Sequence, residues 1–127
     1  MEENDINVNW LAVIVGAVHS YGLGAVWFSP KLFGTKWLEG VGISPDDNSP
    51  MMHAMIVQAL GTFGLAWIIG ITAAEEKLLT AILIVLTIAF LIKANGLFAK
   101  KSMYAIHTEA GFVLAMAVIM IASHMVF

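Results

Sequence analysis

The chain has 127 residues, of which 60% are hydrophobic and only 12% are charged, with a formal net charge of −3. Soluble domains are usually about 45–50% apolar and about 25% charged, so this composition is typical of a protein that lies in a lipid bilayer. The absence of cysteine excludes a disulfide framework and a thiolate metal site. All the cationic side chains are lysine and the net charge is negative, so no nucleic-acid partner is expected.

Four apolar stretches are long enough to cross the hydrocarbon core, which takes about 20 residues as a helix. In chain order they cover residues 9–29, 51–72, 78–99 and 103–126. Short turns join the last three, so these helices are expected to be antiparallel neighbours. The sequence therefore predicts an all-α fold, an up-down bundle of four transmembrane helices that forms a single membrane domain over residues 1–127.

A short amphipathic segment, "KLFGTKWLEG", follows the first helix. It carries Leu32, Phe33, Trp37 and Leu38 beside two lysines, a pattern typical of a helix that lies in the interface between lipid and water. An ordinary loop with a few apolar residues is the alternative.

Lysine placement predicts the orientation of the chain. Lys31, Lys36, Lys100 and Lys101 fall on one side of the predicted bundle, and only Lys77 falls on the other. The positive-inside rule places the four-lysine side in the cytoplasm. Both termini are then expected on the outer side of a bacterial inner membrane.

A stripe of small residues runs along the first helix at four-residue spacing: Ala12, Gly16, Ser20 and Gly24. Helices in lipid associate by close packing of small residues, because lipid tails are as apolar as leucine. The stripe is therefore either a seam to another helix of the same chain or a seam between copies in a homo-oligomer.

Several polar side chains fall inside the predicted spans. Glu109 lies roughly 9 Å and Lys93 roughly 10 Å from the cytoplasmic ends of adjacent helices, which makes a Lys93–Glu109 ion pair geometrically feasible. Glu109 is expected to be either paired in this way or protonated. Intramembrane ionisable groups point to a proton relay or a solute site, and a structural ion pair is the alternative. The full candidate polar cluster consists of His19, Gln58, Lys93, Asn95, His107 and Glu109.

Methionine and histidine recur at i,i+4 spacing in the fourth helix, as Met103–His107 and Met120–His124. Thioether and imidazole suit Cu(I). However, methionine is also common apolar filler, and the two pairs sit at opposite ends of the helix. We expect no metal and no other cofactor, and keep Cu(I) handling as a third functional hypothesis.

A longer motif spans the end of the first helix and the amphipathic segment. "NWLAV" is followed by a G-x-x-W-F-S-P-x-L-F-G-x-x-W pattern, which resembles the DUF1761 family of small bacterial membrane proteins. Phe28 replaces the tyrosine expected in that family. "ANGLFAKKS" and "EAGF" resemble later family segments, with Glu109 where asparagine is expected. The resemblance implies a four-helix membrane topology and brings no activity, because the family is one of unknown function.

The same motif predicts a collar at the cytoplasmic interface, formed by Trp27, Pro30, Phe33, Gly34 and Trp37. The two tryptophans are expected at the level of the lipid headgroups, and Phe33 is expected to insert between helices.

Three functional hypotheses follow. No nucleophile–base arrangement, phosphate loop or zinc signature is present, so the leading one is a non-enzymatic protein. It would act in the lipid bilayer as a homo-oligomer or as an accessory subunit of a larger membrane complex. The second is a small transporter or channel for protons, ions or a small solute, and the third is Cu(I) handling.

Overall fold

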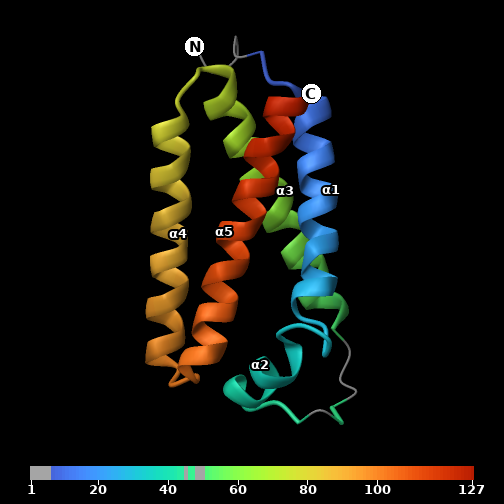
Figure 1. Cartoon of the computed structure of the whole chain (residues 1–127), viewed down its shortest axis with the longest axis vertical. Helices are drawn as coiled ribbons and strands as arrows, with labels where there is room; N and C mark the ends of the chain where they lie inside the picture. Colours follow the sequence, from blue (N-terminus) through green and yellow to red (C-terminus); the bar gives the residue numbers. More distant parts are fainter. Residues whose placement is uncertain (1–6, 45, 48–50) are drawn as a thin grey trace.

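The computed structural model describes residues 7–44, 46–47 and 51–127, and within these ranges it is all-helical, with no strand (Figure 1). Its five helices are α1 (Trp10–Trp27), α2 (Gly34–Val41), α3 (Met52–Ala74), α4 (Leu78–Phe98) and α5 (Met103–Val126). All except α2 are long and apolar enough to cross a membrane. The prediction of an all-α chain with four helices of spanning length is confirmed.

Local sequence explains where α1 begins and where it ends. The Asn9 side chain caps the helix by accepting a 3.2 Å hydrogen bond from the Ala12 amide. The helix ends at Trp27, two residues before the predicted end at Ser29. Pro30 explains the difference, because a residue that precedes proline is disfavoured in the α conformation.

Helix α2 covers the later part of the segment predicted to be amphipathic, from Gly34 onward, and leaves Leu32 and Phe33 before its start. It lies across the end of the bundle opposite to the start of α1 and the end of α5 (Figure 1). Gly42 ends it in the left-handed region, at φ 81°, where glycine has no steric cost.

Tight turns join α3 to α4 and α4 to α5, and both are Schellman motifs. At the end of α4, the Lys100 amide bonds to the Leu97 carbonyl at 3.1 Å and the Lys101 amide bonds to the Gly96 carbonyl at 3.0 Å. Lys100 takes the left-handed position, at φ 59°, that glycine usually fills. The turn places Lys101 directly before Ser102, whose side chain caps α5 by accepting from the Ala105 amide.

Helix α5 is the central helix of the bundle and packs against all the others. Half of its apolar stretch is buried (50%), against only 11% of that of α4. Figure 1 shows α3 crossing behind α5. Helix α3 begins beside α1 at the α2 end of the bundle and finishes beside α4 at the opposite end. A hydrogen bond of 3.2 Å from the Tyr21 hydroxyl to the Met55 carbonyl joins α1 and α3 at the α2 end. Helices α3 and α4 therefore diverge from their shared turn.

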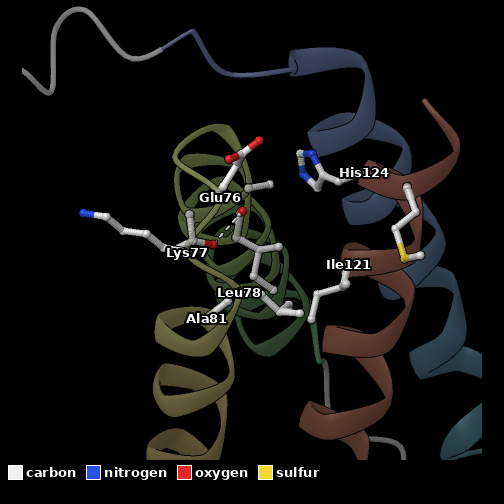
Figure 2. Close-up of a pocket in the computed structure, with 10 residues that line it drawn as sticks. Glu76, Lys77, Leu78, Ala81, Ile121 and His124 are labelled. Carbon is white, nitrogen blue, oxygen red and sulfur yellow. Dashed lines mark hydrogen bonds between the residues drawn. The ribbon is translucent and has the colours of Figure 1, made fainter.

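Near that shared turn, the ends of α3, α4 and α5 surround a pocket of about 390 Å³. Figure 2 shows His124 and Ile121 of α5 on one side of it, facing Glu76 and Lys77 of the turn. The His124 Nε2 atom is buried and makes no hydrogen bond to the part of the chain that the structure describes.

The small-residue stripe of α1 faces α5 of the same chain. Ala12, Gly16 and Ser20 are buried, and a Cβ atom at Gly16 would lie 3.2 Å from the Met120 Cα. Further along, the Ser20 hydroxyl donates to the Met116 carbonyl at 3.3 Å, and Gly24 lies against the Phe112 ring. The stripe therefore packs against another helix of the same chain, which is the first of the two interpretations given above.

Candidate functional site

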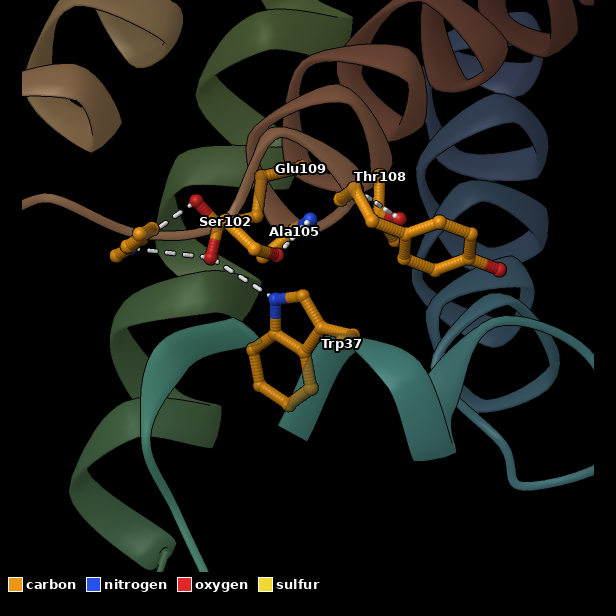
Figure 3. A network of polar contacts seen from close by, with 7 residues as sticks. Trp37, Ser102, Ala105, Thr108 and Glu109 are labelled. Atoms are coloured by element: carbon orange, nitrogen blue, oxygen red, sulfur yellow. Dashed lines mark hydrogen bonds and ion pairs between the residues drawn. The ribbon is translucent and has the colours of Figure 1, made fainter. Parts of the chain in front are cut away.

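Glu109 lies at the centre of a polar site near the α2 end of α5. Its carboxylate accepts a 2.9 Å hydrogen bond from the Trp37 indole nitrogen on α2. Lys101, from the turn before α5, donates to both carboxylate oxygens at 3.1 Å. Figure 3 shows Trp37 directing its ring nitrogen toward Glu109. The side chains are 18% exposed for Glu109 and 31% for Lys101, so the charge pair is partly shielded from its surroundings.

Close backbone contact brings α2 over this carboxylate. The Ser102 amide donates to the Gly40 carbonyl at 3.0 Å. A Cβ atom on Gly40 would collide with the Ser102 hydroxyl and would lie 2.7 Å from the Ala105 Cβ. Glycine at position 40 therefore allows α2 to rest directly on the first turn of α5.

The predicted Lys93–Glu109 ion pair is wrong, since the partner of Glu109 is Lys101. The depth estimate compared only Cα heights. Helical side chains lean toward the N-terminus of their own helix. On α5 that direction carries Glu109 toward α2 and Lys101, whereas on the antiparallel α4 it carries Lys93 the opposite way. Lys93 is partly buried and has no ion pair or hydrogen bond within the described residues.

A pocket of about 290 Å³ opens beside Glu109, between the diverging α3 and α4. Gln58 of α3 and Asn95 of α4 line it together with Glu109, and the Gln58 amide donates to the Thr62 hydroxyl at 2.9 Å. Three of the six residues predicted as a polar cluster therefore share one pocket.

The other three do not line this pocket. His19 is exposed on α1 and its Nδ1 atom lies 2.8 Å from the Val15 carbonyl oxygen of its own helix. His107 is exposed on α5, and Lys93 is on α4 outside the pocket lining. The pocket beside Glu109 therefore joins three of the six predicted residues and leaves the other three outside its lining.

A second, larger pocket of about 590 Å³ adjoins the first, between α1, α2 and α3. Phe28, Gln58 and Phe112 line both pockets and form the boundary between them. The remaining lining of the larger pocket is mainly aliphatic and aromatic, with Trp37 at the α2 side. The two pockets together offer an apolar compartment joined to a polar one.

The residues of the predicted collar form an aromatic cluster where α1, α2 and α5 meet. Trp27 donates from its indole nitrogen to the Thr108 carbonyl at 2.9 Å. The Phe33 ring is partly buried, with its centroid 4.8 Å from that of Trp27 and 6.4 Å from that of Tyr104 on α5.

Gly34 and Pro30 shape the collar backbone. Gly34 is buried, and a Cβ there would lie 2.7 Å from the Ser29 carbonyl carbon, while Pro30 is exposed in the turn. On the other side of α2, Trp37 packs edge-on to Phe28 at 4.9 Å. The contacts of the collar with Thr108 and Tyr104 were missed from the sequence, because the first depends on how α1 packs on α5 and the second on the turn before α2 folding back over α5.

The Cu(I) hypothesis rests on two pairs that the structure keeps apart. Met103 and His107 are exposed near the α2 end of α5. Met120 is buried against Gly16, and His124 lies at the opposite end of the bundle. Within the described residues, no group of three or more His, Cys, Asp or Glu side chains could hold a metal ion.

Comparison with known proteins gives one match. A family model described as "Protein of unknown function (DUF1761)" matches residues 11–124, nearly the whole chain. No curated protein and no solved structure matches. The matched range includes the aromatic collar, Glu109 and the two pockets beside it. The match confirms the resemblance drawn from the Gly24–Trp37 motif, and the chain belongs to the DUF1761 family.

Proposed function

We propose that this protein is a non-enzymatic membrane subunit that works by association, first of all with copies of itself. Helices α1, α3, α4 and α5 cross the bacterial inner membrane, and α2 lies at its cytoplasmic face. Lys31, Lys36, Lys100 and Lys101 all belong to the α2 end, which supports a cytoplasmic position for that end and an outer position for both termini.

The small coverage of α4 is the observation that carries this proposal. Only 11% of its apolar stretch is buried, less than for any of the other three long helices. The helix also carries Lys93, which has no partner among the described residues. A charged group inside a bilayer costs about 2.5–3.5 kcal/mol at the centre and less toward the edge. Packing of α4 against a second protein surface would cover this face and could supply a partner for Lys93.

A homo-oligomer and an accessory role use the same surface and differ in the occupant. The small-residue stripe of α1 already packs inside the chain, so the proposed contact uses α4, most of whose apolar surface is exposed. A larger membrane protein seated on α4 would make this chain an accessory subunit.

Single-cysteine variants test this directly, because the natural chain has no cysteine. Leu86→Cys on α4 and Val18→Cys on α1 place an exposed thiol at corresponding heights in the two helices. Oxidation in native membranes should give a covalent dimer of the Leu86→Cys variant and only monomer of the matched Val18→Cys variant. Association through α4 would be refuted if only the Val18→Cys variant formed a covalent dimer. It would also be refuted if neither variant cross-linked and native mass spectrometry showed a monomer. A stoichiometric complex with a larger protein would favour the accessory role.

A second candidate function is passage of a proton or small solute, and the pocket beside Glu109 favours it. One carboxylate and two carboxamides from α3, α4 and α5 line this pocket, which opens between α3 and α4, where Gln58 and Asn95 are exposed. If passage occurs, proteoliposomes with the natural protein should dissipate a pH gradient or release a trapped solute, and Glu109→Gln should stop this. Equal leakage from empty liposomes would exclude it.

A further inference from the structure

We propose that the two adjoining pockets form one binding site for a hydrophobic amine. Its apolar body would occupy the larger pocket and its protonated nitrogen the smaller one, beside Glu109. The proposal concerns binding, and it supplies the ligand class for the second candidate function without depending on it.

The size and lining of the two compartments suit an amphiphilic ligand. Small-molecule pockets are usually about 300–1,000 Å³, mostly apolar, with a few placed polar groups. The larger compartment measures about 590 Å³ and is lined by groups such as Leu38, Met55 and Ala54. The smaller measures about 290 Å³ and holds Glu109 and Asn95. A molecule that spans both would pass Phe28 and Phe112, which line each of them.

The polar compartment is rich in hydrogen-bond acceptors. The Gln58 amide nitrogen already donates to Thr62, which leaves its carbonyl oxygen available to a ligand. The Asn95 side chain makes no hydrogen bond to the rest of the described chain. Glu109 has about four lone-pair positions, and Trp37 and Lys101 donate to only some of them. A primary ammonium group brings three donors and no acceptor, which complements this set.

Charge and aromatic faces favour a cation in the same place. Phe28 and Phe112 meet edge to face, with ring centroids 5.2 Å apart, at the boundary of the two compartments. Aromatic rings attract cations within about 6 Å of the centroid. An anionic ligand of the same shape would meet the Glu109 carboxylate, and a neutral alcohol would gain neither interaction.

Lys101 is the internal competitor for this site, because its ammonium group occupies the carboxylate that the ligand needs. Its side chain is 31% exposed and starts in the turn at the end of the bundle, so its long stem can carry the charge outward to the lipid headgroups. Binding would then exchange one ammonium group for another. Removal of the Lys101 charge should therefore tighten binding, an effect that a purely structural role of the ion pair does not produce.

The test uses the full chain in phosphatidylcholine nanodiscs and three probes with one common body: 4-phenylbutylamine, 4-phenylbutanol and 4-phenylbutyrate. Isothermal titration at neutral pH, corrected for partitioning into empty nanodiscs, should show saturable binding of the amine, at least about 10-fold tighter than that of the other two. Glu109→Gln should weaken amine binding about 10-fold or more, and Lys101→Gln should strengthen it about 3- to 10-fold. His107→Gln, on an exposed residue of the same helix, is the matched control and should leave it unchanged.

Absence of saturable amine binding, equal binding of the acid, or unchanged binding in Glu109→Gln would each overturn the proposal. Unchanged or weaker binding in Lys101→Gln would also overturn it, because the two ammonium groups would then not compete. Should Glu109→Gln fail to fold, Asn95→Leu on the thinly covered α4 serves in its place, with an expected loss of about 5-fold. Amine binding without any flux in proteoliposomes would exclude passage and leave the binding site standing.

Discussion

The hydrogen bond between Trp37 and Glu109 should hold α2 on the bundle, and a double-mutant cycle measures how strongly. Trp37→Phe keeps an aromatic ring against Phe28 but removes the indole donor, and Glu109→Met removes the acceptor. The bond is 2.9 Å long, and its acceptor is a carboxylate that also pairs with Lys101 and is only 18% exposed. Hydrogen bonds to charged groups contribute about 1.5–3 kcal/mol, so we expect a coupling free energy in that range.

The assay is the free energy of unfolding of the four proteins of the cycle, measured by reversible denaturation in mixed micelles. The cycle cancels the lost ring area of Trp37→Phe and the unpaired Lys101 of Glu109→Met, because each appears in a single variant and again in the double variant. Trp10→Phe is the matched control, since Trp10 stacks on Phe63, lies tilted against Trp67 and makes no hydrogen bond to Glu109. A Trp37–Glu109 coupling below about 0.5 kcal/mol, no larger than that of the control cycle, would refute the reasoning.

Two further predictions concern the backbone of α4 and its turn. Gly96→Ala should destabilise the protein by about 1–3 kcal/mol in the same assay, because the new Cβ would lie 2.6 Å from Cγ1 of the fully buried Ile106. Gly61→Ala, at a helical glycine with nothing within 4 Å, should be neutral or stabilising, and an equal loss from both variants would contradict this. Lys100→Gly should raise stability by up to about 1 kcal/mol, because Lys100 holds a left-handed conformation at φ 59° that glycine adopts without steric cost; a loss of stability would be the opposing result.

Apolar length and amphipathic pattern were enough to predict the helices. Hydrophobic runs set the four long helices to within two residues at each end, and the lysine-flanked apolar residues of the following segment marked α2. These features depend on local composition, which a single sequence contains. The ends of α1 and α3 show the largest errors, two residues each, and Pro30, three residues beyond Trp27, accounts for that of α1.

The partners of Glu109 were harder to predict, because they depend on side-chain direction and on the path of α2. Depth along neighbouring helices suggested Lys93, and the lean of each side chain toward its own N-terminus selected Lys101 instead. That lean is a general rule and could have been applied to the sequence. The contact with Trp37 could not, since it requires α2 to rest on the start of α5, through Gly40, and no local pattern specifies that docking.

The central position of α5 has a consequence for how the protein is made. The helix that every other helix packs against is the last of the five in chain order. In the membrane position proposed above, α1, α3 and α4 enter the bilayer before α5 has been made, and Gly16 of α1 faces lipid until Met120 of α5 packs against it. Insertion of the helices into the bilayer and their packing around α5 are then separate stages. The bundle can be completed only after α5 has been synthesised and inserted. A chaperone that binds incompletely synthesised membrane proteins would therefore encounter this chain while the small-residue stripe of α1 is still exposed.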